Sequence, residues 1–250
     1  MKRDIVGWRA ILQGLIFPRH RCLLCRLEKK LDDAGLCASC RDQLSNLRDG
    51  WVACQFCATF IPAGKIVCTN CQHTRTGRWF DMARAALPYE GEVRECLHLF
   101  KYRGKSSFAR PLGLLMLEAV QNDARFQFLE LVVPVPLHPA KLKERGYNQA
   151  KLLAEELARS LGLPLAADLL VREVNTLSQT GLTKKARAEN LTNAFRLNKN
   201  GKIRHKRILL VDDIYTTGAT VNACAQILKK GGADQVCVAA CAAGKEQKNR

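Results

Sequence analysis

Two patterns of apolar and polar positions divide the chain near residue 80. Beyond that residue, stretches with apolar side chains at helical spacing alternate with short, continuous apolar runs. The helical spacing predicts helices over residues 90–102, 106–121, 149–161, 183–190 and 220–230. The continuous runs at 129–135, 208–211 and 235–240 predict strands buried on both faces. This alternation predicts an α/β fold with an open, mainly parallel sheet and helices on both faces.

The first residues of the chain have a helical pattern of their own. Apolar side chains recur at helical spacing there: Ile5, Trp8, Leu12, Leu15 and Ile16. The pattern predicts a helix that docks on the protein, and a helix lying on a membrane surface is the alternative. Polar residues interrupt the run and no small-residue cleavage site follows it, so a secretory signal is not expected. No apolar run reaches the roughly 18 residues of a membrane span, and we expect a cytoplasmic protein.

Cysteine is the chief feature of the segment before residue 80. Eight of the twelve cysteines form four Cys-x-x-Cys knuckles: Cys22/Cys25, Cys37/Cys40, Cys54/Cys57 and Cys68/Cys71. Two knuckles together supply the four thiolates of a tetrahedral Zn²⁺ site. Structural zinc is favoured over disulfides, which need an oxidising compartment, and over an iron–sulfur cluster or a redox dithiol. Closed four-thiolate sites leave no open coordination position, so we expect the metal to hold the fold.

The spacing leaves the pairing of the knuckles open. Sequential pairing is the simplest and gives two zinc ribbons, whereas an interleaved pairing would join the first knuckle to the third. The remaining cysteines lie in apolar contexts that are typical of a core: Cys96, Cys224, Cys237 and Cys241. We therefore expect an N-terminal helix and double zinc-ribbon module over residues 1–79, and a second domain over residues 80–250.

The chain is strongly basic, with a formal net charge of +17. Eight cysteine thiolates and two zinc ions would lower this to about +13. Such a charge favours phosphate-rich partners without saying which one. A basic stretch precedes the run at 208–211, and either it binds nucleic acid or it is a solvated face. Its residues are Arg196, Lys199, Lys202, Arg204, Lys206 and Arg207.

The segment 208–220 carries the clearest site chemistry. A buried run ends in Asp212 and Asp213, and a loop of small residues then opens a helix. Backbone N–H groups, threonine hydroxyls and the helix dipole would converge there on one anion. Gly218 would allow a close backbone approach or a positive φ. Adjacent carboxylates beside a phosphate seat suit a ligand that carries both a phosphate and a neutral diol.

This segment resembles the phosphoribosyl-pyrophosphate (PRPP) motif of the type I phosphoribosyltransferases. Nearly the whole chain resembles, more narrowly, the competence protein F (ComF/GntX) family. That resemblance includes the knuckles and residues 100–104, 133–138 and 145–149. It continues through Gln179-x-x-Leu182 and Arg187-x-x-Asn190-x-x-x-Ala194-Phe195. The resemblance implies a type I phosphoribosyltransferase-like sheet preceded by the zinc-ribbon module.

The resemblance also implies roles for matching residues. Asp212 and Asp213 would hold the ribose hydroxyls, and Mg²⁺ would bridge the pyrophosphate and the diol. Lys141, Lys143 and Arg145 could close over the pyrophosphate or form a solvated loop, and Arg187 and Asn190 could equally be structural. The 5′-phosphate would contact Thr216, Thr217, Gly218, Ala219 and Thr220, and the pyrophosphate loop would consist of Lys101, Tyr102, Arg103 and Gly104.

Two functions are consistent with these residues. The resemblance implies a PRPP-binding protein that handles DNA during natural transformation, with single-stranded DNA and a competence helicase as partners. The second function is that of an active phosphoribosyltransferase, which transfers ribose 5-phosphate to a nitrogenous base. No segment identifies a base-binding hood, and the catalytic residues and the acceptor are not predicted.

Overall fold

The central element of the computed structural model is a sheet of four parallel strands in the order β3-β8-β7-β4. The structure describes residues 21–73, 77–102, 106–174, 194–198 and 203–246. The strands are β3 (Met82–Pro88), β4 (Leu131–Pro134), β7 (Arg207–Tyr215) and β8 (Gln235–Ala243). The helices expected in the first 20 residues and at 183–190 lie outside the described residues.

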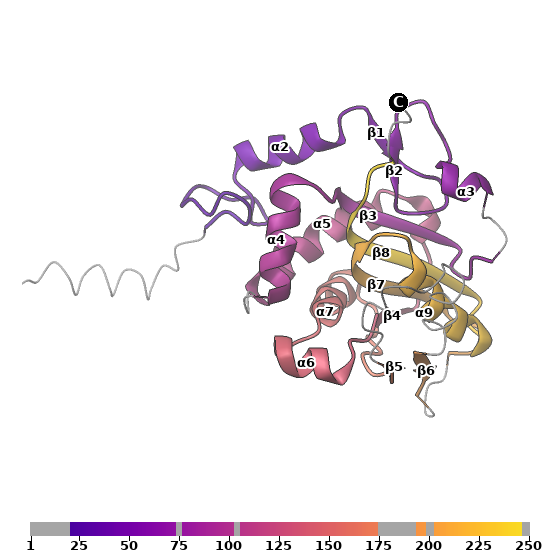
Figure 1. Ribbon diagram of the computed structural model, residues 1–250. Helices are drawn as coiled ribbons and strands as arrows, with labels where there is room; N and C mark the ends of the chain where they lie inside the picture. Colours follow the sequence, from indigo (N-terminus) through magenta and orange to yellow (C-terminus); the bar gives the residue numbers. More distant parts are fainter. Residues whose placement is uncertain (1–20, 74–76, 103–105, 175–193, 199–202, 247–250) are drawn as a thin grey trace, which may run out of the picture.

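Helices cover both faces of this sheet (Figure 1). One face packs against α4 (Gly91–Tyr102), α5 (Ala109–Gln121) and α7 (Gln149–Leu161), and the other packs against α9 (Ala219–Lys230). Short 3-10 turns, Ser106–Phe108 and Ala124–Phe126, flank α5. The predicted open parallel sheet with helices on both faces is confirmed.

Side chains of the central strands alternate between two cores, as the pleat of a strand requires. In β7, Ile208 and Leu210 face α9, whereas Leu209 and Val211 face α5 and α7. The strand is longer than the predicted run at 208–211. Its pairing with β8 continues past the two aspartates to Tyr215, which lies opposite Ala243. The acidic pair therefore belongs to the strand, and the loop starts at Thr216.

Several elements beyond residue 80 were not predicted. Strand β3 has the sequence Met-Ala-Arg-Ala-Ala-Leu-Pro, whose alanines give little strand signal. Residues 139–145 form a short helix, α6 (Pro139–Arg145), which His138 caps and Gly146 ends in the left-handed region. Strands β5 (Leu170–Arg172) and β6 (Phe195–Leu197) form a small antiparallel pair outside the main sheet.

The cysteine-rich segment is built from α2 (Ala38–Arg48), β1 (Trp51–Ala53), β2 (Phe60–Pro62) and α3 (Thr69–His73). It wraps around one edge of the sheet, so that its two halves join different cores. The first half packs on the side of α4 and α5. The second half packs on the side of α9, where Phe60 pairs with the residues after β8. Among the described residues, no helix is long and apolar enough to cross a bilayer.

Candidate functional site

The predicted phosphate seat is a tight turn between β7 and α9. Gly218 has a φ of 76° and directly precedes the first residue of α9. Its carbonyl accepts a hydrogen bond from the Asn222 backbone N–H at 2.8 Å, which closes the first helical turn. The first N–H groups of a helix lack intrahelical partners and face outward, so this turn offers donors to an anion.

The acidic pair lies where β7 passes the end of α4. The Asp213 carboxylate forms an ion pair with Lys101, with 3.0 Å between the Nζ and Oδ2 atoms. Asp212 accepts a hydrogen bond from the Asp213 backbone N–H at 2.9 Å. Burial, and then the charge of Asp213, raises the pKa of Asp212 to about 7. Asp212 is therefore partly protonated near neutral pH.

These groups line a cavity of about 380 Å³ at the carboxyl end of the sheet, which we name the strand-end pocket. The position agrees with the rule for ligand sites in open α/β sheets. Cations line the pocket together with the acidic pair and the threonine hydroxyls. The polar lining consists of Asp212, Asp213, Thr216 and Thr220, the cations Lys101, Lys141, Arg145 and Arg172, and Tyr89, Asn148 and Gln149.

A network of contacts orients Arg145 in this pocket. Its guanidinium lies 4.9 Å from the ring centre of Tyr102 and donates to Gln149 Oε1 at 3.2 Å. Gln149 in turn donates to the Lys101 carbonyl at 3.3 Å. Tyr147 donates to the Phe100 carbonyl, and the Asn148 side chain caps α7. The segment 145–149 thus ties α6 and α7 to the end of α4, next to Lys101.

The structure brings together part of the predicted PRPP set. Asp212, Asp213, Thr216, Thr220 and Lys101 line the strand-end pocket, as do Lys141 and Arg145. Tyr102 does not line the pocket, but its ring contacts Arg145, which does. Thr217, Gly218 and Ala219 form the turn beside the pocket. Arg103, Gly104, Arg187 and Asn190 lie outside the described residues.

Sequence reasoning missed Arg172. This residue ends β5, stacks on Phe195 at 5.3 Å, and lines the pocket together with Asp212. Burial lowers its pKa. The only signal in the sequence is a single arginine after the apolar residues Leu169, Leu170 and Val171. That pattern does not indicate which site the arginine would reach.

The basic stretch between Arg196 and Arg207 is largely paired with carboxylates. Arg196 forms an ion pair with Glu173, and both Lys206 and Arg207 lie beside Glu130. The Lys206 Nζ atom lies 2.9 Å from Glu130 Oε1. This hydrogen bond is the main reason why the pKa of the Glu130 carboxyl is lowered. Lys199 and Lys202 lie outside the described residues. The described part of this stretch therefore offers less free positive charge than its sequence suggests.

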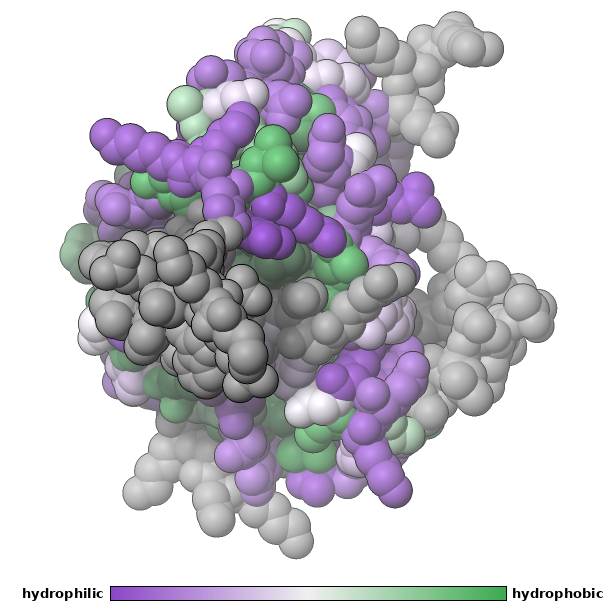
Figure 2. All heavy atoms as spheres, turned by 90° about the vertical axis from the view of Figure 1, so that its left-hand side faces the viewer, coloured by the Kyte–Doolittle hydropathy of each residue, from purple (hydrophilic) through white to green (hydrophobic). Residues whose placement is uncertain are grey.

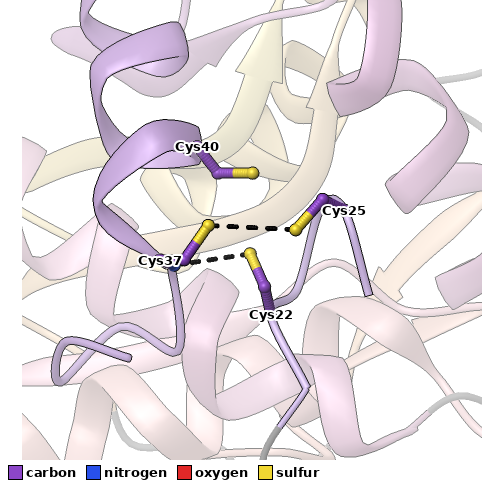
Figure 3. Close-up of side chains that lie close together, drawn as sticks. All are labelled: Cys22, Cys25, Cys37 and Cys40. Atoms are coloured by element: carbon purple, nitrogen blue, oxygen red, sulfur yellow. Dashed lines mark hydrogen bonds between the residues drawn. The ribbon is translucent and has the colours of Figure 1, made fainter. Parts of the chain in front are cut away.

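The cysteines form two groups, and these follow the sequential pairing. Cys22, Cys25, Cys37 and Cys40 form the first cluster. Its four side chains converge on one point, two from a loop and two from the start of α2 (Figure 3). The sulfurs of Cys25 and Cys37 are 3.8 Å apart, and Cys22 Sγ accepts from the Cys37 backbone N–H. All described cysteines are free thiols, so the geometry contradicts a disulfide interpretation.

Cys54, Cys57, Cys68 and Cys71 form the second cluster, in which every thiol is buried. Its Cys57 and Cys68 sulfurs are 3.6 Å apart. A Zn–S bond of about 2.3 Å places tetrahedral sulfurs about 3.8 Å from each other, so both clusters have the dimensions of a Zn²⁺ site. The Arg78 guanidinium donates to Cys71 Sγ at 3.3 Å and offsets thiolate charge there. Both groups could therefore hold a metal ion.

Comparisons with known proteins found similar sequences and structures. Residues 148–250 match the family model described as a phosphoribosyl transferase domain. The chain is 32% identical to "Competence protein F" of Haemophilus influenzae, over 88% of this chain and 95% of that protein. It is also 32% identical to "DNA utilization protein YhgH" of Escherichia coli, over 81% and 94%. A solved purine phosphoribosyltransferase from Pyrococcus horikoshii overlaps 51% of this chain and 69% of its own, with 18% identity and a TM-score of 0.32.

Proposed function

We propose that this chain, which belongs to the competence protein F family, binds PRPP in the strand-end pocket and couples that binding to the handling of DNA. The observation that carries the proposal is that one pocket collects two chemical sets of groups. An acidic pair and threonine hydroxyls line it together with four cations. A ligand with a diol, a phosphate and a pyrophosphate matches both sets at once.

Each of these two sets of groups has a distinct task. Asp212 and Asp213 would accept hydrogen bonds from the two ribose hydroxyls, while the turn at Gly218 and the first turn of α9 would hold the 5′-phosphate. Lys101 and Arg145 would contact the pyrophosphate, with Lys141 and Arg172 adding charge. Magnesium would enter with the pyrophosphate, because hard oxygen ligands suit it. Charge-assisted hydrogen bonds of about 1.5–3 kcal/mol each make micromolar affinity attainable.

The raised pKa of Asp212 gives this proposal a pH signature. The ribose hydroxyls bind an ionised carboxylate more strongly than a neutral carboxyl, and below about pH 7 the free protein holds a proton on Asp212. Binding to the ionised form then releases that proton, so PRPP affinity should fall by up to about tenfold per pH unit below 7. Calorimetry with Mg²⁺ present, at several pH values, measures this dependence.

The matched control is Asp212→Asn, which keeps the shape and removes the titration. This variant should bind PRPP more weakly and should lose the part of the pH dependence that comes from Asp212. The pH dependence that remains in the variant comes from titration of the phosphate groups of PRPP itself. Absence of PRPP binding by the folded wild type, or an unchanged affinity and pH profile in the variant, would sink the proposal.

A transferase function needs an acceptor subsite, and a second cavity adjoins the pocket. It has a volume of about 480 Å³ and shares Pro136, Leu137, Asn148 and Arg172 with the strand-end pocket. A nitrogenous base bound there would lie next to the pyrophosphate side of the ligand. Release of pyrophosphate in the presence of a single base would establish the reaction and name the acceptor.

The face that carries α4 and α6 is a better candidate for DNA binding than the stretch Arg196–Arg207, because it combines exposed rings with cations. This face is largely hydrophilic outside the residues drawn in grey (Figure 2). Tyr102 is 53% exposed and lies between His98, at 4.8 Å, and Arg145. Arg26 and Arg94 line a hollow of about 700 Å³ beside them. Exposed rings next to cations are how proteins bind single strands without sequence preference.

We therefore expect the double variant Arg26→Ala/Arg94→Ala to flatten the salt dependence of single-stranded DNA binding. The log–log slope should change by about 1.4, since each phosphate contact contributes about 0.7. Tyr102→Ala should lower the affinity about tenfold through lost stacking. Gel-shift titrations at several salt concentrations measure both effects.

The basic stretch supplies the competing variant, Lys202→Ala/Arg204→Ala/Lys206→Ala. If this triple variant flattens the slope and the α4 double variant does not, DNA binds the stretch rather than α4. Wild type that binds no DNA at low salt would remove both surfaces as DNA sites. A helicase partner, expected from the family resemblance, stays a prediction.

A further inference from the structure

Tyr215 connects the phosphate turn to the second cysteine cluster. It is the last residue of β7, directly before the turn, and only 5% of it is exposed. Its ring meets the edge of Phe80, with centroids 6.2 Å apart and planes at 89°. Its hydroxyl lies beside the Cys57 side chain, and Tyr215, Cys57 and Cys71 belong to the same buried core. One side chain thus joins the ligand loop to a group of metal ligands.

The Tyr215 hydroxyl also limits the space around Gly218 in the turn. A Cβ atom on Gly218 would lie 2.4 Å from the Tyr215 hydroxyl oxygen and 2.7 Å from Cζ. The turn is therefore in direct contact with Tyr215. A shift of that ring would change the position of the N–H groups at the start of α9.

Asn222 makes a second, independent connection. Its side chain accepts a hydrogen bond from the Trp79 backbone N–H at 2.7 Å and donates to the Gly77 carbonyl at 3.3 Å. Residues 77–80 lead from the second cluster into β3, and Arg78 within them donates to Cys71. The first turn of α9 is consequently held by the segment that the second cluster anchors.

The first cluster has no comparable connection within the part of the chain that the structure describes. Its half of the module contacts α5 through the Arg41–Glu118 ion pair and β3 through a hydrogen bond from Arg48 to the Ala86 carbonyl. Those contacts lie on the opposite face of the sheet from α9. Variants of the first cluster can therefore serve as the control for the effect of the second cluster on the phosphate turn.

We propose that the metal-bound second cluster positions the phosphate turn, and that Tyr215 is the positioning residue that couples them. This inference rests on the proposed PRPP function for its ligand, but the coupling itself is a property of the protein. Because coupling is reciprocal, metal in the second cluster should strengthen PRPP binding, and PRPP should strengthen metal binding there by the same factor. Coupling of this kind is typically about 5- to 150-fold.

The test compares two matched double variants, Cys68→Ser/Cys71→Ser in the second cluster and Cys37→Ser/Cys40→Ser in the first. The second-cluster variant should lose PRPP affinity by at least about fivefold, and the first-cluster variant should stay close to wild type. Each variant keeps one cluster, so chelator competition reports the zinc affinity of that cluster. PRPP should raise this affinity only where the second cluster remains.

Two further measurements keep the test decisive. Tyr215→Phe retains the ring and all thiols and removes only the hydroxyl, so it should weaken PRPP binding about fivefold without loss of zinc. Hydrogen exchange of residues 212–222 needs no ligand, and it should accelerate in the second-cluster variant but not in the first-cluster variant. This readout stands even if the proposed PRPP function fails because wild type does not bind PRPP. Equal exchange in the two double variants, or an unchanged turn in both, would overturn the coupling.

Discussion

Replacement of Gly218 by valine should abolish PRPP binding, with an affinity loss of at least about a hundredfold, or about 2.8 kcal/mol. Two physical costs act together. A β-branched residue at a φ of 76° is strained, which costs about 1–3 kcal/mol. The new side chain would also overlap Tyr215, whose hydroxyl oxygen lies 2.4 Å from the Cβ position. The turn must move to relieve both, so it loses the shape that holds the phosphate. Calorimetry with PRPP and Mg²⁺ measures the loss.

Gly50→Val is the matched control for this prediction. Gly50 has a φ of 72°, yet no atom lies within 4 Å of its Cβ position, and it precedes β1 away from the pocket. This variant should be destabilised by backbone strain and still bind PRPP with wild-type affinity. If Gly218→Val binds PRPP as well as Gly50→Val does, the turn is not the phosphate seat.

Purified protein should contain about two zinc ions per chain, and their removal should have the largest effect on folding. Binding of structural zinc contributes an apparent 10–16 kcal/mol per site in small zinc modules. Chelation should therefore unfold residues around the first cluster. Metal analysis and circular dichroism before and after chelation measure both quantities.

Loss of metal from the first cluster and loss of metal from the second cluster should affect the stability of the sheet differently. Loss of the first cluster should leave the parallel sheet folded, whereas the second cluster shares a core with β7, β8 and α9. We therefore propose that the sequence pattern changes near residue 80, but that the segments before and after this residue do not fold independently of each other. Folded, metal-free protein with oxidised cysteines would contradict the zinc assignment.

The sequence by itself determined several features that depend on neighbours a few residues apart. The Cys-x-x-Cys spacing predicted four-thiolate groups, because a knuckle is a local turn. The apolar pattern predicted α7 with its observed bounds, because helical spacing is also local. The predicted role of Gly218 had the same basis, and its φ is indeed positive. An alanine-rich strand such as β3 escaped prediction because its partner β8, more than a hundred residues away, provides its stability.

Only the tertiary structure decided which distant residues meet. The spacing left two knuckle pairings open, and packing on opposite faces of the sheet selected the sequential one. No local pattern indicated that Arg172 lines the same pocket as Asp212, or that Glu130 pairs with Lys206. Nor could one place Tyr215 against Cys57, because the two are 158 positions apart. Such contacts depend on how strands are ordered and which face each side chain takes, and these follow from burial summed over the whole chain.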